Sequence, residues 1–291
     1  MSFARRPVLF VSLAAVLASN APAAEPPPSA GVFAKDNLVA WCIVPFDAKS
    51  RGPAERAEML VRLGIKRAAY DWRANHVPTF EEEVLAYKKH GLEYFAFWSW
   101  HPAMALLIEK HGIRPQIWMT LGSPGGATQE ERVEAAAKAM LPHVERTRKL
   151  GCKLGLYNHG GWGGEPANLV AVCRRLRETG DADHVGIVYN LHHGHGHIGD
   201  FAEVLAVMKP YLLCLNLNGM NDNAQPKILP IGQGRHDVAL IKIIKESGYD
   251  GPIGILDHRG SVDAEQSLTE NLDGLKKVLE QLGEDEAART Y

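Results

Sequence analysis

The stretch at residues 185–197 reads Val-Gly-Ile-Val-Tyr-Asn-Leu-His-His-Gly-His-Gly-His, an apolar run followed by a loop with four histidines and two glycines. Short β-branched runs of this kind are typical of strands that are buried on both faces of a parallel sheet. Imidazole is a common metal ligand and is well suited to proton transfer near neutral pH. The stretch therefore predicts a buried strand that delivers reactive groups at its C-terminal end. A solvated loop that is merely rich in histidine is the alternative.

A buried strand followed by an amphipathic helix recurs along the chain. With the opening stretch as the sixth unit, strands are predicted at residues 38–44, 66–70, 92–98, 114–120, 153–157, 211–217 and 251–256. Apolar residues at helical spacing predict helices at residues 53–63, 80–90, 103–111, 128–150, 166–179, 201–208, 236–247 and 264–282. Thr79 and Thr128 are candidate N-caps, and Thr128 can form a capping box with Glu131.

Strict alternation of strands and helices indicates a parallel sheet with helices outside it. Eight such units in a chain of this length predict an α/β protein with a single closed (β/α)8 barrel, the TIM barrel, rather than a doubly wound open sheet. The first strand is not followed by the Gly-x-Gly-x-x-Gly pattern, so no nucleotide cofactor is expected. In such a barrel the C-terminal ends of all strands meet at one mouth.

The first 23 residues have the features of a cleavable signal peptide. Arg5 and Arg6 precede an apolar segment at residues 7–17, and small residues at 21–23 supply a cleavage pattern. The apolar segment is shorter than the ~20 residues that span a bilayer. We expect a periplasmic or secreted protein with a signal peptide (1–23), a proline-rich tether (24–36), the barrel (37–283) and a polar tail (284–291).

The overall composition restricts the class of partner. Of the 291 residues, 46% are hydrophobic, which is enough apolar content for one large core. The formal net charge of −2 provides no field to attract nucleic acid or an anionic membrane surface, so the expected partner is a small molecule. The four cysteines are sparse and include no Cys-x-x-Cys pair, which favours free buried thiols over a disulfide framework. The oligomeric state is left open.

Polar side chains are concentrated where the predicted strands end. If the barrel closes, its mouth collects Asp71, Trp72, Arg73, Trp98, Trp100, Tyr157, Asn158, His159, Asn190, His192, His193, Asn216, Asn218, Asp257 and His258. A role in a turn or in packing could account for any one of these residues. Their occurrence together at the ends of six strands indicates a polar ligand pocket. Indole faces cover the apolar faces of a pyranose, and amides both donate to and accept from hydroxyl groups. A carbohydrate is therefore the expected small molecule.

Several loop segments occur in the order and spacing of a known family. They read Tyr-Asn-His-Gly-Gly at 157–161, Asn-Leu-His-His at 190–193, Leu-Asn-Leu-Asn at 215–218, Pro-Ile-Gly-Gln-Gly at 230–234 and Gly-Tyr-Asp-Gly-Pro-Ile at 248–253. Over residues 37–282 the chain resembles the sugar phosphate isomerase/epimerase family of xylose isomerase-like TIM barrels. The resemblance implies a metal-dependent isomerase or epimerase of sugars, or a related lyase, hydratase or endonuclease.

The chain departs from the family pattern at the metal-binding carboxylates. Tyr157 and Asn190 stand where the family usually has Glu and Asp, and Gln233 replaces another Glu. The last Glu aligns with Leu256, or with Asp257 if the register shifts by one residue. Hard cations require anionic oxygen ligands, which neutral amides do not supply. The divalent metal that the resemblance implies, zinc or manganese, would rest on His159, His193 and His195, preferably with Asp257. A site without metal is equally open.

We expect an exported sugar isomerase- or epimerase-like enzyme that transfers a proton next to a carbonyl group. The catalytic candidates are His193 as base or metal ligand, His159 as its partner and Asp257 as an orienting carboxylate. Substrate contacts are expected from Asp71, Trp98, Asn158, Asn190, Asn216, Asn218 and Gln233. The alternatives are a lyase or hydratase of oxidised glycosides and a non-catalytic carbohydrate-binding barrel. An endonuclease would require more carboxylates and a basic groove. The sequence leaves the sugar and the metal open.

Overall fold

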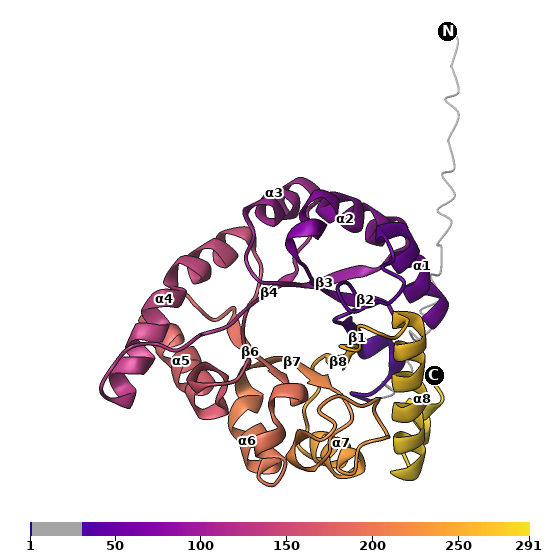
Figure 1. Cartoon of the computed structure of the whole chain (residues 1–291). Helices are drawn as coiled ribbons and strands as arrows, with labels where there is room; N and C mark the ends of the chain where they lie inside the picture. The colour runs from indigo at the N-terminus through magenta and orange to yellow at the C-terminus, as the bar shows by residue number, and fades with distance from the viewer. Residues whose placement is uncertain (2–30) are drawn as a thin grey trace.

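Parallel strands pair in chain order, and the last strand pairs with the first, so the sheet closes into a barrel (Figure 1). The strands are β1 (Leu38–Trp41), β2 (Arg67–Asp71), β3 (Glu93–Trp98), β4 (Gln116–Met119), β5 (Leu154–Tyr157), β6 (Val185–Asn190), β7 (Leu212–Leu217) and β8 (Ile253–Leu256). This computed structural model describes Met1 and residues 31–291. The prediction of a single (β/α)8 barrel is confirmed, whereas the predicted signal peptide and most of the tether fall in residues 2–30, outside the described part.

Helices lie around the outside of the barrel, one after each strand (Figure 1). They are α1 (Pro53–Leu63), α2 (Phe80–Lys89), α3 (Pro102–His111), α4 (Gln129–Leu150), α5 (Pro166–Thr179), α6 (Phe201–Met208), α7 (Asp237–Glu246) and α8 (Ala264–Gln281). Short 3-10 helices lie in the connections, among them η2 (Ala74–Thr79), η4 (Leu191–His193) and η5 (His195–His197). In the described residues, no helix is both long enough and apolar enough to cross a membrane.

The two predicted N-caps have different outcomes. The Thr128 hydroxyl accepts a hydrogen bond from the Glu131 amide at 3.2 Å, and the Glu131 carboxylate accepts one from the Thr128 amide, so the capping box is confirmed. The Thr79 cap is wrong, because residues 74–79 already form η2 and the Thr79 hydroxyl donates to the carbonyl of His76 instead. The four cysteines are buried and free, as predicted.

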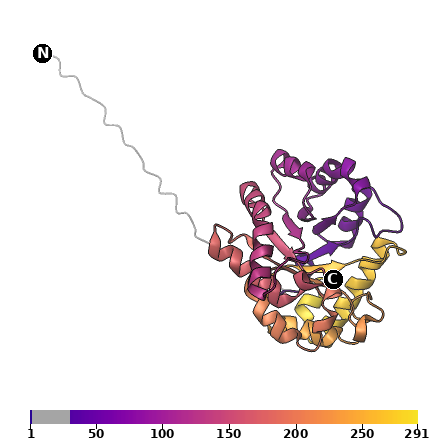
Figure 2. The ribbon, with the colours of Figure 1, turned by 60° about the vertical axis from the view of Figure 1, so that its left-hand side comes forward.

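The C-terminal residues, expected to form a polar tail, pack against the segment before β1. Residues expected to be a tail contain a short helix, α9 (Asp285–Ala288), whose Ala287 and Ala288 are buried. The Tyr291 hydroxyl donates a hydrogen bond to the carbonyl of Phe33 at 2.8 Å. The first and last units of the barrel, drawn in indigo and yellow, therefore lie side by side (Figure 2).

Aromatic rings meet inside the barrel, near the C-terminal ends of the strands. Trp41 on β1 lies 4.8 Å from Trp118 on β4, measured between ring centroids, and Trp118 lies 5.8 Å from Tyr157 on β5. Since β1 is not a neighbour of β4 or β5 in the sheet, these rings meet across the barrel. Residues that alternate with them along the strands pack outward against the helices. The register of each strand thus decides which side chain at its end faces inward.

A glycine on β8 makes room for a buried amide, which leads to a first prediction. Gly254 is paired with Asn216 on β7, and a Cβ atom at Gly254 would overlap the Asn216 Oδ1 atom. We expect Gly254→Ala to lower the free energy of unfolding by about 1–3 kcal/mol, as overpacked cores do. Urea denaturation measures the change. Gly196→Ala is the control, because a Cβ there meets no atom within 4 Å; equal stability of the two variants would contradict the prediction.

Candidate active site

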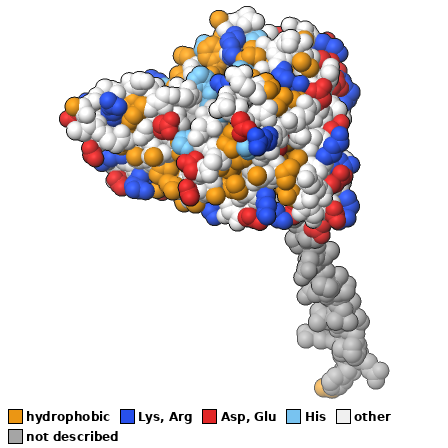
Figure 3. All heavy atoms as spheres, turned by 60° about the horizontal axis from the view of Figure 1, so that its bottom comes forward, with side chains coloured by type: hydrophobic (Ala, Val, Ile, Leu, Met, Phe, Trp, Pro, Cys, Tyr) orange, Lys and Arg blue, Asp and Glu red, His pale blue; other side chains and the backbone are white. Residues whose placement is uncertain are grey.

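Side chains at the C-terminal ends of the strands enclose a small cavity of about 90 Å³. Its walls are Trp41, Cys42, Phe46, Asp71, Arg73, Trp98, Tyr157, His159, Asn190, His192, His193, Leu256 and His258. Histidine side chains are grouped near the middle of one face of the molecule in Figure 3. Of the residues predicted from the sequence, the cavity brings together Asp71, Trp98, His159, Asn190 and His193.

Asp71 is a buried carboxyl group at the end of β2. Its side chain faces the cavity, and only 2% of the residue is exposed. Within residues 31–291 no group donates a hydrogen bond of ordinary length and angle to either carboxylate oxygen, although the Cys42 thiol and the backbone amides of Asp71 and Val44 lie near this carboxyl group. Burial raises the pKa of Asp71 to about 7, and the nearby Arg73 guanidinium and the backbone amides of Asp71 and Val44 offset this only in part. A group with this pKa exchanges a proton readily near neutral pH, as a general base or acid must.

Cys42 lies beside Asp71 in a strained backbone conformation. It directly follows β1 and has a φ angle of 62°, which is uncommon for a residue with a side chain. Burial raises the pKa of the Cys42 thiol well above its ordinary value, and the neighbouring Asp71 and Asp257 carboxylates raise it further. The thiol therefore stays protonated and is a poor nucleophile or metal ligand. Its role in the cavity is that of a small, weak hydrogen-bond donor next to Asp71.

Tyr157 and Asn190 are joined by a hydrogen bond between the ends of β5 and β6. The Asn190 side-chain amide donates to the Tyr157 hydroxyl at 2.6 Å, and the Trp41 indole donates to the same hydroxyl at 3.3 Å. The Asn190 Oδ1 atom accepts from the His192 amide at 3.1 Å. Burial raises the pKa of Tyr157, so the phenol stays protonated. The Asn190 side chain thus uses one of its two N–H groups and its oxygen within the protein, which fixes the orientation of its amide.

Four imidazoles form a row across the mouth. The ring centroids of His159 and His193 are 4.5 Å apart, those of His193 and His192 are 4.5 Å apart, and those of His192 and His258 are 5.0 Å apart. Burial, followed by the neighbouring imidazoles, lowers the pKa of His192 and of His193 to about 3. These two rings are therefore neutral near pH 7, where each can donate one hydrogen bond and accept another.

The three histidines predicted as metal ligands are only partly brought together. His159 and His193 lie side by side, but His195 does not line the cavity, and its Nδ1 atom is 3.1 Å from the carbonyl oxygen of His192. Within the described chain, no group of three or more His, Cys, Asp or Glu side chains is arranged to hold a metal ion. The donor set at the mouth therefore does not fit a divalent cation, and we derive no chemical step through one.

Three predicted substrate contacts face away from the cavity or into the barrel. Asn158 exchanges two hydrogen bonds with the backbone of Asn190, at 2.7 and 3.1 Å. Asn216 is fully buried over Gly254 and accepts from the Cys214 thiol. Asn218 donates to the carbonyl of Gly219 at 2.9 Å. These amides hold strand ends and loops in place instead of lining the cavity.

The remaining predicted residues, Asp257 and Gln233, also lie outside the cavity. Asp257 follows the inward-facing Leu256 and points toward Ser267 of α8 in the outer layer. Its carboxyl group is buried, and burial raises its pKa to about 7. Gln233 is exposed on a turn whose structure depends on Asp237. That carboxylate accepts hydrogen bonds from the amides of Gly232 and Gly234 at 2.7 and 2.9 Å.

Sequence reasoning assigned no role to several residues that line the cavity, namely Trp41, Cys42, Phe46, Arg73, Tyr157, His192 and His258. Four of them, Arg73, Tyr157, His192 and His258, stand at predicted strand ends. The signal that could have selected Tyr157 is alternation, because Leu154–Tyr157 places Tyr157 on the inward face and leaves Asn158 on the other. Cys42 and Phe46 carry no such signal.

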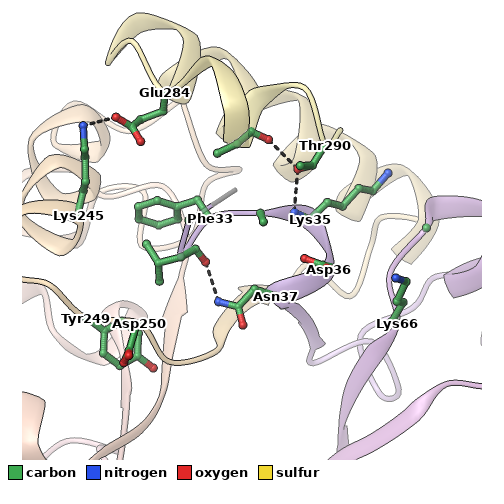
Figure 4. Close-up of a pocket in the computed structure, with 15 residues that line it drawn as sticks. Phe33, Lys35, Asp36, Asn37, Lys66, Lys245, Tyr249, Asp250, Glu284 and Thr290 are labelled. Carbon is green, nitrogen blue, oxygen red and sulfur yellow. Dashed lines mark hydrogen bonds and ion pairs between the residues drawn. The ribbon is translucent and has the colours of Figure 1, made fainter. Parts of the chain in front are cut away.

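A larger hollow of about 1040 Å³ lies at the opposite end of the barrel (Figure 4). Its labelled side chains come from the segment before β1, from Lys66 before β2, from Lys245 on α7, from the loop before β8 and from the residues on either side of α9. Lys245 is paired with Glu284, and the Lys35 amide donates to the Thr290 hydroxyl at 2.9 Å. Because (β/α)8 barrels carry their reactive groups at the C-terminal ends of the strands, we place the candidate active site at the smaller cavity in the mouth.

The fold and the mouth define a (β/α)8 barrel with a buried carboxyl group of raised pKa among aromatic rings, imidazoles, an amide and the Arg73 guanidinium. The sequence model of the xylose isomerase-like TIM barrels matches residues 103–278, which is more than half of the chain. The chain belongs to this family, and the resemblance noted from its motifs is confirmed. No curated protein matches it by sequence.

Three solved structures with the same fold match this chain over nearly the whole of their own length. The 3-keto-D-glucoside 4-epimerase YcjR from E. coli is 15% identical, with a TM-score of 0.61 over 84% of this chain and 99% of its own. The IOLI protein, solved with a zinc atom, is 12% identical, with a TM-score of 0.65 over 84% and 98%. The probable 3-DHS dehydratase AsbF from Bacillus anthracis is 13% identical, with a TM-score of 0.63 over 82% and 98%. At these identities the likeness shows the fold.

Proposed function

We propose that the protein is an enzyme that removes and returns a proton next to the carbonyl group of a sugar. The observation that carries this proposal is Asp71, a carboxyl group that is 2% exposed, lines a cavity in the barrel mouth and has a pKa of about 7. At neutral pH about half of such carboxyl groups are ionised, so the same side chain can accept a proton and give it back.

The histidines that line the cavity with Asp71 are assigned a different task from the one first expected. An imidazole with a pKa of about 3, such as His193, is a weak base but remains a neutral hydrogen-bond donor at pH 7. We therefore assign proton transfer to Asp71 and the binding of sugar oxygens to His193 and His159. The Trp98 ring, 5.7 Å from His159 between centroids, forms an apolar wall against which a sugar ring can pack.

The size of the cavity limits how a sugar can bind. Its volume of about 90 Å³ is below the ~300–1,000 Å³ of sites that enclose a drug-sized ligand. The cavity therefore receives the carbonyl carbon and its neighbours, while the rest of the sugar extends over the rim at His159 and Arg73.

The outcome of the proton transfer defines the finer reaction class. Return of the proton to the other face of the same carbon gives an epimer, return to the neighbouring carbon gives an isomer, and loss of a leaving group gives elimination. We favour isomerisation or epimerisation and keep a lyase or hydratase of keto-glycosides as the alternative. Similar folds carry both kinds of name, an epimerase of a keto-glucoside and a dehydratase. We also propose export to the periplasm or beyond, from the signal-peptide features of residues 1–23.

Proton exchange in heavy water tests the proposal whichever product is formed. The purified protein is incubated in D2O with a panel of ketoses and 3-keto-glycosides, and loss of the proton next to the carbonyl is followed by NMR. We expect exchange with at least one compound, undiminished by EDTA, and slowed when His193 or His159 is replaced by Ala. The absence of exchange with the whole panel, with and without added zinc or manganese, would refute the proposal.

A non-catalytic carbohydrate-binding barrel is the second candidate. It is favoured by the residues at the strand ends, where Tyr157, Asn190 and Leu256 line the cavity in place of metal-binding carboxylates. Titration calorimetry with the same panel separates the two functions. Binding of a sugar without proton exchange supports the binding protein, and exchange at a catalytic rate supports the enzyme.

A further inference from the structure

The Tyr157 hydroxyl uses its oxygen, but not its proton, in hydrogen bonds within the protein. It accepts from the Asn190 side-chain amide at 2.6 Å and from the Trp41 indole at 3.3 Å. The orientation of the Asn190 amide is fixed, because its Oδ1 atom accepts from the His192 backbone amide at 3.1 Å. The nitrogen of that amide must therefore be the atom that faces Tyr157. An indole nitrogen can only donate, so both neighbours of the hydroxyl are donors.

The remaining proton of Tyr157 is directed to the cavity. A phenolic hydroxyl has one proton to donate, and its oxygen here already accepts twice. In the described part of the chain, Tyr157 donates no hydrogen bond, although it is 2% exposed and lines the cavity. A buried donor without a partner is costly to keep. The geometry is therefore that of a donor that is completed by a ligand in the cavity.

We propose that the Tyr157 hydroxyl donates a hydrogen bond to the carbonyl oxygen of the substrate and stabilises the enediolate that forms from it. This inference rests on the proposed function and narrows the substrate to a sugar that presents a free carbonyl group. The C–H bond next to the carbonyl breaks and its proton moves to Asp71. The electron pair forms a carbon–carbon double bond, and the carbonyl π electrons move to the oxygen held by Tyr157. Asp71 then returns the proton to the former carbonyl carbon, while the proton of the neighbouring hydroxyl moves to the oxygen held by Tyr157, so that the carbonyl group is formed at the neighbouring carbon.

The surroundings of Tyr157 suit a donor that keeps its proton. Burial raises the pKa of the phenol, and the hydrogen bonds from Trp41 and Asn190 offset this only in part. Accepting two hydrogen bonds polarises the O–H group and strengthens the bond that it donates. The rings of Trp41 and Trp98, whose centroids lie 6.1 and 4.6 Å from that of Tyr157, keep water away from this side. In such surroundings a fixed donor stabilises developing negative charge more strongly than water does.

Two phenylalanine variants test the proposal. Tyr157→Phe removes the donor, and Tyr189→Phe removes a buried hydroxyl from the next strand that lies outside the cavity and has no partner in the described chain. With a keto-sugar that the wild type exchanges in D2O, we expect Tyr157→Phe to lower kcat about 10²–10³-fold and to change KM little. Tyr189→Phe is expected to keep the wild-type rate. Equal rates in both variants would overturn the role of Tyr157.

A third variant keeps the phenol but redirects its proton. In Asn190→Asp, measured at pH 9, a carboxylate oxygen replaces the amide that donates to Tyr157, so the hydroxyl turns to donate to Asp instead of to the cavity. We expect a loss of kcat as large as in Tyr157→Phe, with circular dichroism spectra showing that the fold is intact. A folded Asn190→Asp variant with the wild-type rate would also overturn the proposal.

A binding measurement separates failure of this inference from failure of the proposed function. Acetohydroxamate is a small planar mimic of an enediolate and is titrated into the wild type and both phenylalanine variants by calorimetry. We expect binding to the wild type and to Tyr189→Phe, and at least 10-fold weaker binding to Tyr157→Phe. If the wild type exchanges no sugar, the proposed function fails, while this pattern of binding still supports the donor. Equal binding in all three proteins, or none in the wild type, overturns it.

Discussion

The Asp71→Asn variant is expected to lose proton exchange by a factor of about 10²–10⁴, because it removes the general base, and at the same time to gain stability above pH 7. The gain follows from the pKa. Asp71 ionises near its ordinary value of 3.8 in the unfolded chain but at about 7 in the folded chain. Binding of a proton therefore stabilises the fold fully below about pH 4, and this stabilisation is lost as the pH rises through about 7.

The expected size of the gain comes from the same two pKa values. A pKa difference of about three corresponds to about 4 kcal/mol, which is the upper limit of what the ionised carboxylate costs the folded wild type at pH 9. Asparagine cannot ionise and avoids this cost. Urea denaturation at pH 4 and at pH 9 should show similar stability of Asp71→Asn and wild type at the lower pH and a more stable variant at the higher pH.

Asp257→Asn is the matched control for both effects. Asp257 is also a buried carboxyl group whose pKa is raised to about 7 by burial, but it faces α8 and does not line the cavity. We expect this variant to gain stability at pH 9 in the same way while keeping proton exchange within about tenfold of the wild type. Loss of exchange in Asp257→Asn together with full exchange in Asp71→Asn would reverse the assignment and restore the role first expected for Asp257.

Arg56→Met is expected to destabilise the fold by about 3–5 kcal/mol. The Arg56 guanidinium on α1 donates to the Glu83 carboxylate on α2 and to the carbonyl of Arg51. The two charged side chains are 4% and 0% exposed, so removal of the cation leaves a buried carboxylate without its partner. Denaturation with urea measures the loss, and the double variant Arg56→Met/Glu83→Met should recover much of it, because no unpaired charge remains.

The exposed pair Lys149–Glu145 provides the reference for this prediction. Its side chains are 66% and 60% exposed, and such pairs contribute about 1 kcal/mol or less. Lys149→Met should therefore change the free energy of unfolding by less than about 1 kcal/mol. If Arg56→Met is no more destabilising than Lys149→Met, the buried pair does not join α1 to α2 in the way its geometry indicates.

The barrel could be predicted because the patterns that form its strands and helices involve residues close together in the sequence. Each strand is a short apolar run, each helix has apolar residues at helical spacing, and features such as the Thr128–Glu131 capping box involve neighbours in the chain. Thr79 shows the limit of this reasoning, since its hydroxyl was needed in η2 instead of at the start of α2. Such a local competition between two hydrogen-bond partners is not visible in the sequence pattern.

The sequence predicted where the candidate site lies, but not the role of each side chain in it. Strand ends were enough to place Asp71, His159 and His193 at the mouth, because parallel strands in a closed barrel all point the same way. The role of each side chain depends on which face of the strand it occupies. A shift of one residue exchanges Leu256 for Asp257 and Tyr157 for Asn158, and only the closed sheet fixes that choice.

The sequence by itself determined the alternation of strands and helices, the closed barrel that follows from it, and the concentration of imidazoles, amides and carboxyl groups at one end. Only the tertiary structure decided that Asp71 is buried at the cavity, that burial lowers the pKa of His192 and His193, and that the Tyr157 hydroxyl accepts two hydrogen bonds and donates none among the described residues. The reason is physical: hydrophobic periodicity is a property of the chain, whereas burial and hydrogen-bond partners depend on residues distant in sequence.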